Sequence, residues 1–181
     1  EKERRDGIPL NLRQNRAGNA AYYNNKLMLG PLSKKDEAEM TQLMHDGDMD
    51  FGVWSELTTK NINLTRGGNS EQETFKSDPH YTATNRMIDN AATIGMYTGE
   101  KRPKKGEAIL EWEYQNDVAT TQAKADLVRS IRRHTIDTPG KTFDYNQWWV
   151  DYVKANYGTG TGPTTKSFWS SLDIGGWLTT N

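Results

Sequence analysis

The stretch from Glu107 to about His134 constrains the fold more than any other part of this 181-residue chain. The residues expected to face the core recur at spacings of four, four, three, four and three: Leu110, Tyr114, Val118, Thr121, Ala125 and Val128. That period is the α-helical one. At ~1.5 Å per residue the helix would be roughly 40 Å long, well above the mean of ~11–12 residues. The stretch therefore predicts one long helix.

A helical hairpin is expected between residues 33 and 57. Ser33 is a good N-cap, with Asp36 three residues later in a box-like arrangement, and Gly47 ends the first helix. The apolar residues recur at spacings of one, three or four: Met40, Leu43 and Met44 in the first helix, and Phe51, Trp54 and Leu57 in the second. The segment from 61 to 77 is polar and is interpreted as a loop.

Two more helices have clear start signals. Asp78 followed by Pro79 is typical of an N-cap and first helical position, and that helix is expected to reach about Tyr97. Asp144 caps the last helix, which Gly158 ends. Its aromatic positions match one helical face: Tyr145, Trp148, Trp149, Tyr152 and Val153. With no strand pattern evident, we predict an all-α fold, an irregular bundle of about five helices.

The flanking regions differ from this helical domain of residues 32–158. Residues 1–31 carry six Lys or Arg side chains against three acids, and Asn11–Asn25 is rich in Asn, Gln and Ala. We interpret residues 1–31 as a basic N-terminal arm with loose or short helical structure. Residues 159–181 are interpreted as a Gly/Thr linker and an extended aromatic tail.

The aromatic tail is the strongest sign of protein binding. Its large apolar side chains are the predicted partner-binding residues: Phe168, Trp169, Leu172, Trp177 and Leu178. Exposed groups of this size are an aggregation liability, and Trp is a favoured interface anchor. We expect the tail to dock on its own bundle or in a neighbour's groove.

Composition excludes several kinds of chemistry. The chain has no Cys, which removes disulfides, thiolate metal sites and cysteine nucleophiles. Its formal net charge is −1, so no overall field attracts nucleic acid. It contains no nucleotide-binding, hydrolase or zinc-protease motif. We therefore expect no enzyme activity, no catalytic residue and no cofactor. We also expect no membrane span and, since no secretion signal is seen, a location in a virion or the cytoplasm.

The turn between the hairpin helices resembles a calcium loop in part. Asp46, Asp48 and Asp50 occupy the first three ligand positions, but Phe51 stands where the loop needs Gly and Leu57 where it needs Glu. We interpret these acids as helix caps rather than a metal site, and expect no bound ion.

Nucleic-acid contact is an alternative that the neutral charge disfavours. Its candidate residues lie in two basic clusters: Arg4, Arg5, Lys101, Arg102, Lys104 and Lys105. A third cluster spans Arg129–Arg133. Phosphate contacts need only positive charge in the right place, and a binding surface would require these clusters to share one face.

The segments 33–57 and 143–158, long amphipathic helices in an Asn/Thr-rich, Cys-free chain, resemble helical internal (ejection) proteins of short-tailed bacteriophages. That resemblance implies an oligomeric structural part that contacts other virion proteins. Our leading hypothesis is a non-enzymatic assembly protein that binds copies of itself or other subunits. The alternatives are a lytic or other enzyme with an unrecognised site, and a helical nucleic-acid-binding module.

Overall fold

Every regular element in the described part of the chain is helical. The computed structural model describes residues 16–66, 74–104 and 106–158. The all-α prediction is confirmed. The elements, in order, are α2 (Arg16–Leu29), α3 (Lys34–His45), α4 (Phe51–Thr65), the short 3₁₀ helix η1 (Thr74–Ser77), α5 (Pro79–Thr93), α6 (Glu107–Asp137) and α7 (Tyr145–Tyr157).

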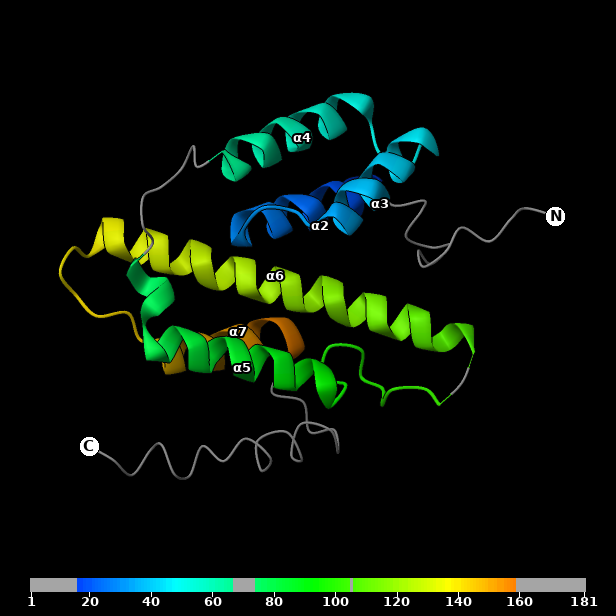
Figure 1. Ribbon diagram of the computed structural model, residues 1–181. Helices are drawn as coiled ribbons and strands as arrows, with labels where there is room; N and C mark the ends of the chain where they lie inside the picture. Colours follow the sequence, from blue (N-terminus) through cyan, green and yellow to red (C-terminus); the bar gives the residue numbers. More distant parts are fainter. Residues whose placement is uncertain (1–15, 67–73, 105, 159–181) are drawn as a thin grey trace.

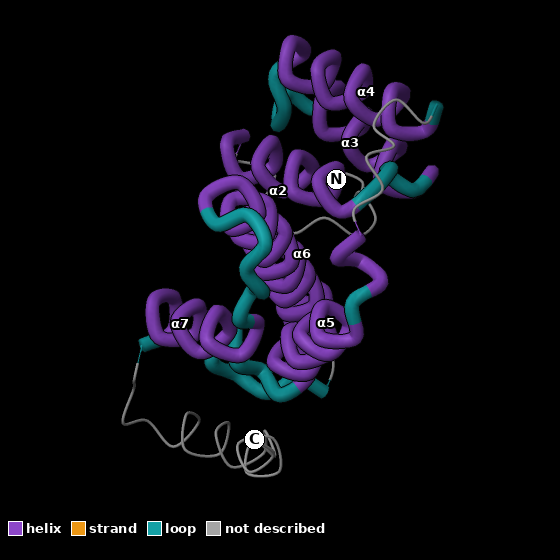
Figure 2. The backbone as a smooth tube through the Cα atoms, turned by 90° about the vertical axis from the view of Figure 1, so that its left-hand side faces the viewer, coloured by secondary structure: helices purple, strands orange, loops and turns teal. Residues whose placement is uncertain are grey.

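The long helix α6 runs through the middle of the molecule. Helices α2, α3 and α4 lie on one side of it, and α5 and α7 lie on the other (Figure 1). The view turned by 90° shows the same two groups separated by α6 (Figure 2). The helix has 31 residues, as the periodic stretch predicted within a few residues.

Two hydrophobic cores form on the two sides of α6. The first joins α5, α6 and α7 through Ile88, Ala91, Ala123, Leu127, Ile131, Tyr145, Trp149 and Val153. The second joins α2, α3 and α4 through Tyr22, Tyr23, Leu27, Leu32, Met40, Leu43, Met49 and Leu57, with Val118 of α6 packed against it. Helix α6 therefore has two apolar faces, whereas the sequence pattern identified only the one containing Val118.

Helix α2 lies within residues 1–31, the segment interpreted as a basic arm with loose or short helical structure. From Arg16 to Leu29 the chain is a regular helix with Tyr22, Tyr23 and Leu27 buried against its neighbours. Its buried Asn25 is satisfied from α6, since its Nδ2 donates to Gln122 Oε1 at 2.6 Å. Such long-range partners are invisible in the local pattern. Residues 1–15 lie outside the described part.

Two helix ends differ from the prediction. Helix α4 continues to Thr65, through residues expected to be loop, because buried Asn61 accepts from the Leu32 amide at 2.8 Å and donates to Glu37 at 2.7 Å. Helix α5 ends at Thr93, four residues before Tyr97, because Gly95 adopts a φ of 76°.

Candidate interaction surfaces

The Asp46–Asp50 turn is built from helix caps. Asp50 caps α4, with its Oδ1 accepting from the Gly52 amide at 2.7 Å, and Asp46 accepts from Gln42 Nε2 at 2.9 Å. The Asp48 carbonyl accepts from Asn19 Nδ2 at 3.1 Å, which ties the turn to α2. Within the described ranges, no group of three or more His, Cys, Asp or Glu side chains is placed to hold a metal ion.

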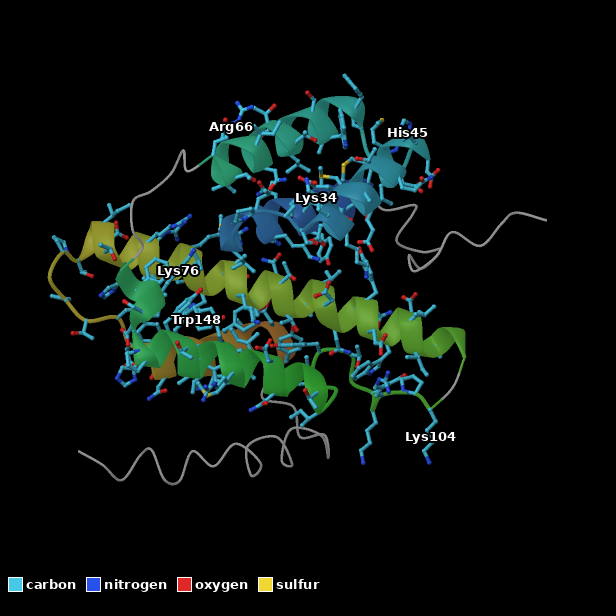
Figure 3. All side chains as sticks on the ribbon, in the orientation of Figure 1. Lys34, His45, Arg66, Lys76, Lys104 and Trp148 are labelled. Carbon is cyan, nitrogen blue, oxygen red and sulfur yellow. The ribbon has the colours of Figure 1, made fainter. Side chains whose placement is uncertain are left out.

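The basic clusters that can be located lie far apart along the long helix. Lys101, Arg102 and Lys104 precede α6, and Lys104 points away from the bundle (Figure 3). Arg129 lies 22 residues into α6, which places it about 33 Å along the axis from the start of the helix. Arg129 is also occupied, since its guanidinium bonds Asp126 at 2.5 Å and also reaches Asn25. Residues Arg4, Arg5 and Lys105 lie outside the described part.

The predicted docking residues of the tail, from Phe168 to Leu178, also lie outside the described residues. The helix that leads to them is as expected. Asp144 accepts from the Gln147 amide at 2.9 Å, and Trp149 and Val153 are buried. The half-buried Trp148 donates from Nε1 to Ser130 Oγ of α6 at 2.9 Å, which ties α7 to the long helix (Figure 3).

A groove of about 430 Å³ lies where α2, α3 and α6 meet. Its walls carry the rings of Tyr22, Tyr23 and Tyr114 and the charges of Lys26 and Asp117, among others. The Lys26 ammonium lies 4.6 Å from the centre of the Tyr22 ring, which is a cation–π distance. Sequence reasoning missed this groove because its first wall belongs to α2, which had no clear helical period.

Most charged groups of this groove already have partners within it. Lys26 Nζ lies 2.6 Å from Asp36 and 3.7 Å from Asp117, and the Tyr22 hydroxyl donates to Asp117. Burial acts to raise the pKa of Asp36, but the hydrogen bonds from Lys26 and Ser33 and the Lys26 charge outweigh it, so that pKa lies below its usual value. The groove is therefore best explained as a junction that joins three helices.

The burial of the tyrosines supports the same interpretation. Burial, followed by the charge of Asp117, raises the pKa of Tyr114 to about 12. Burial likewise raises the pKa of Tyr22 above its ordinary value, and the hydrogen bond to Asp117 adds to the effect. Both phenols stay neutral at physiological pH, where they serve as packing surface and, for Tyr22, as a hydrogen-bond donor.

One flank of α4 carries no charge and has two exposed apolar side chains at its ends, with half-buried Ser55 and Thr58 between them. Phe51, Ser55, Thr58 and Ile62 recur at spacings of four, three and four, so they share one flank. We call these four residues the α4 stripe. Phe51 is 65% exposed and Ile62 is 42% exposed, although both are large apolar side chains.

The two charged residues of α4 lie on another flank. Successive residues of a helix are ~100° apart round its axis. Glu56 and Lys60 therefore lie about 140° and 180° from Phe51, whereas the four residues of the α4 stripe span an arc of roughly 60°. Glu56 and Lys60 pair with each other at 2.7 Å, and Lys60 Nζ lies 3.4 Å from Asn24 of α2. The charged flank thus adjoins α2, and the α4 stripe has no charged neighbour on its own helix.

The three apolar residues that recur at a spacing of three in α4 are not equally buried. Of Phe51, Trp54 and Leu57, only Leu57 is fully buried. The Phe51 ring instead packs beside Trp54, with 5.7 Å between ring centres. A spacing of three over two short turns does not fix which flank a neighbouring helix will cover.

The comparisons with known proteins leave the function open. No family model matches the chain, and neither the curated proteins nor the solved structures contain a match. Among the described helices, none combines the length and the apolar character needed to cross a bilayer.

Proposed function

We propose that this protein is a non-enzymatic assembly protein that binds copies of itself or other protein subunits. The observation that carries the proposal is the α4 stripe, a helix flank with two exposed large apolar side chains and no charge. Large apolar side chains that are exposed on the same flank of one helix favour a contact with another protein there.

Two further features support the proposal. The groove between α2, α3 and α6 is occupied by internal ion pairs, so its geometry favours a structural role. The aromatic residues Phe168, Trp169 and Trp177 add interface-prone side chains to the same chain. The resemblance to ejection proteins of short-tailed phages gives the proposal a setting, a virion, on the strength of that resemblance alone.

The proposal is tested by measuring the mass of the full chain in solution over a range of concentrations. We expect an oligomer whose mass falls on dilution, and which loosens when Phe168, Trp169 and Trp177 are all replaced by Ser. Truncation after Gly158 should have the same effect. A monomer at every concentration, with a mass unchanged by either alteration and no binding to co-purified subunits, would contradict it.

A further inference from the structure

We propose that the contact between α2 and α6 opens and closes while the helices on each side of it stay folded together. The helices α2, α3 and α4 form one body, which we call the N-terminal unit. The elements η1, α5, α6 and α7 form the other, which we call the C-terminal unit (Figure 2). The contact of residues 22–29 of α2 with residues 114–129 of α6 is called the seam. This inference goes beyond the proposed function, because it concerns a conformational change within one chain.

Each unit has a hydrophobic core of its own. The buried core residues of the C-terminal unit all lie in α5, α6 and α7, from Ile88 to Val153. Those of the N-terminal unit all lie between Tyr22 and Leu57, and Val118 of α6, which packs against them, is only partly buried. Among the described residues, neither cluster of buried apolar side chains spans the seam. Because apolar burial is the main source of stability, it holds each unit together more firmly than it holds the two units to each other.

The seam is held by polar side chains of α2. The Tyr22 hydroxyl donates to the carboxylate of Asp117. Asn25 Nδ2 donates to Gln122 Oε1 at 2.6 Å, and Asn25 Oδ1 accepts from Arg129. All of these groups can bond water when the seam is open, so the net cost of breaking such bonds is small. Opening the seam should therefore cost much less than exposing either core.

Helix α6 presents a small apolar residue to the middle of the seam. Ala125 lies between Gln122 and Arg129, at spacings of three and four, so it shares the flank that faces α2. It is fully buried there. Ala123 is also fully buried, but in the core of the C-terminal unit. The two alanines are about 160° apart round the helix, so one reports on the seam and the other on a core.

Two hollows lie along the seam. The groove of about 430 Å³ has walls from α2 and α3 on one side and from α6 on the other. A second hollow of about 410 Å³ lies between residues 29–32 and the middle of α6, near Lys124. Lys26, Asp36 and Asp117 line both hollows. Packed cores contain few voids larger than a water molecule, so the two units interlock less closely along the seam than the helices within either core.

Opening the seam would expose surface that the closed chain hides. This surface includes the rings of Tyr22 and Tyr114, whose centres lie 5.7 Å apart across the seam, and the neighbouring Val118 and Ala125 of α6. Polar contacts between separately folded units usually allow relative motion, and such openings cost less than global unfolding. The seam therefore acts as a device that hides or presents an aromatic and apolar flank of α6 without unfolding the chain.

The absence of cysteine allows the opening to be measured by thiol labelling of the full chain. Ala125→Cys places a thiol in the seam. Ala123→Cys is the matched control, because it is the same substitution at a fully buried position of the same helix. At low protein concentration and without denaturant, the Ala125→Cys thiol should react with a maleimide at least about tenfold faster than the Ala123→Cys thiol. Equal rates would overturn the proposal, because both thiols would then react through the same unfolding event.

The dependence of these rates on urea gives a second readout. Opening the seam exposes less surface than unfolding a core, and the slope with urea scales with the surface exposed. At low urea, the logarithm of the Ala125→Cys rate should rise with a slope no more than about half that of the Ala123→Cys rate. The same slope for both thiols would mean that the seam opens only on global unfolding, and would overturn the proposal.

Two further thiols test whether the N-terminal unit stays folded when the seam opens. Met40→Cys and Met49→Cys place thiols in its core, where each methionine is 2% exposed. At least one of them should react about tenfold more slowly than the Ala125→Cys thiol, because its core remains closed. If both react as fast as the Ala125→Cys thiol, the N-terminal unit unfolds instead of moving as one body, and the proposal is wrong.

Discussion

The structure and the sequence pattern predict opposite effects of Gly95→Ala on the free energy of unfolding. Gly95 has a φ of 76°, and its amide donates to the Ala92 carbonyl at 3.0 Å, while the Met96 amide donates to the Ala91 carbonyl at 3.0 Å. These two bonds form a Schellman motif with glycine in the left-handed position. A Cβ added at Gly95 would lie 2.0 Å from the carbonyl oxygen of Glu100.

The expected loss has two parts. The left-handed backbone costs an L-residue roughly 1–2 kcal/mol, and forcing a methyl group into backbone costs about 1–3 kcal/mol. Gly95→Ala should therefore destabilise the protein by about 2–5 kcal/mol. Gly99 is the matched control, because its φ is 70° but nothing lies within 4 Å of its added Cβ. Gly99→Ala should show the first part alone, about 1–2 kcal/mol.

Urea unfolding of the full chain, followed by far-ultraviolet circular dichroism, measures both losses. The sequence pattern placed Gly95 inside a helix that runs to Tyr97, where Ala would stabilise by about 1 kcal/mol. A stabilised or unchanged Gly95→Ala variant would refute the capping geometry. Equal losses at Gly95 and Gly99 would refute the close approach to Glu100 while leaving the left-handed backbone in place.

Two other substitutions test the polar contacts between helices. Asp36→Asn removes the carboxylate that caps α3 and pairs with Lys26, and should cost about 1 kcal/mol at neutral pH. Because the pKa of Asp36 is lowered in the folded protein, its stabilisation is present above the usual pKa of ~4 and is lost as pH falls through the folded value. Thermal melts should show the gap between wild type and variant closing below about pH 4, and a constant gap would contradict the ion pair. Asn61→Ala leaves the buried Leu32 amide without its acceptor and should cost about 1–3 kcal/mol in urea unfolding. Exposed Asn63→Ala is the control and should stay within about 0.5 kcal/mol, so equal losses would argue against the Asn61 contact.

The sequence was most informative where structure depends on near neighbours. Ser33 and Asp36 form the predicted capping box, and Asp78 and Asp144 cap the helices that follow them. Each of these contacts spans two or three residues, so residue type and spacing are enough to specify it. The long helix was predictable for a related reason, since a period sustained over many turns outweighs local ambiguity.

Features that depend on distant partners could not be predicted in this way. The buried Asn19 and Asn25 of α2 read as polar arm residues, yet they bond Asp48 and Gln122, which lie 29 and 97 positions away. The second apolar face of α6, which includes Leu127, was missed because a helix covered on both sides has no single stripe. The candidate surface on α4 was missed because apolar spacing alone does not tell a covered flank from a free one.

The position of α4 in the fold explains why one of its flanks is free. Helix α2 packs directly on α6, whereas α4 packs on α2 and α3 and so lies one layer farther out (Figure 1). A helix that only covered α2 and α3 would be better formed with Glu, Lys or Ala at its outward positions. The exposed positions of α4 do include Glu56 and Lys60, but Phe51 and Ile62 are exposed as well. Large apolar side chains gain nothing from solvent, so a protein contact at this flank would cover the two side chains that the fold of one chain leaves exposed.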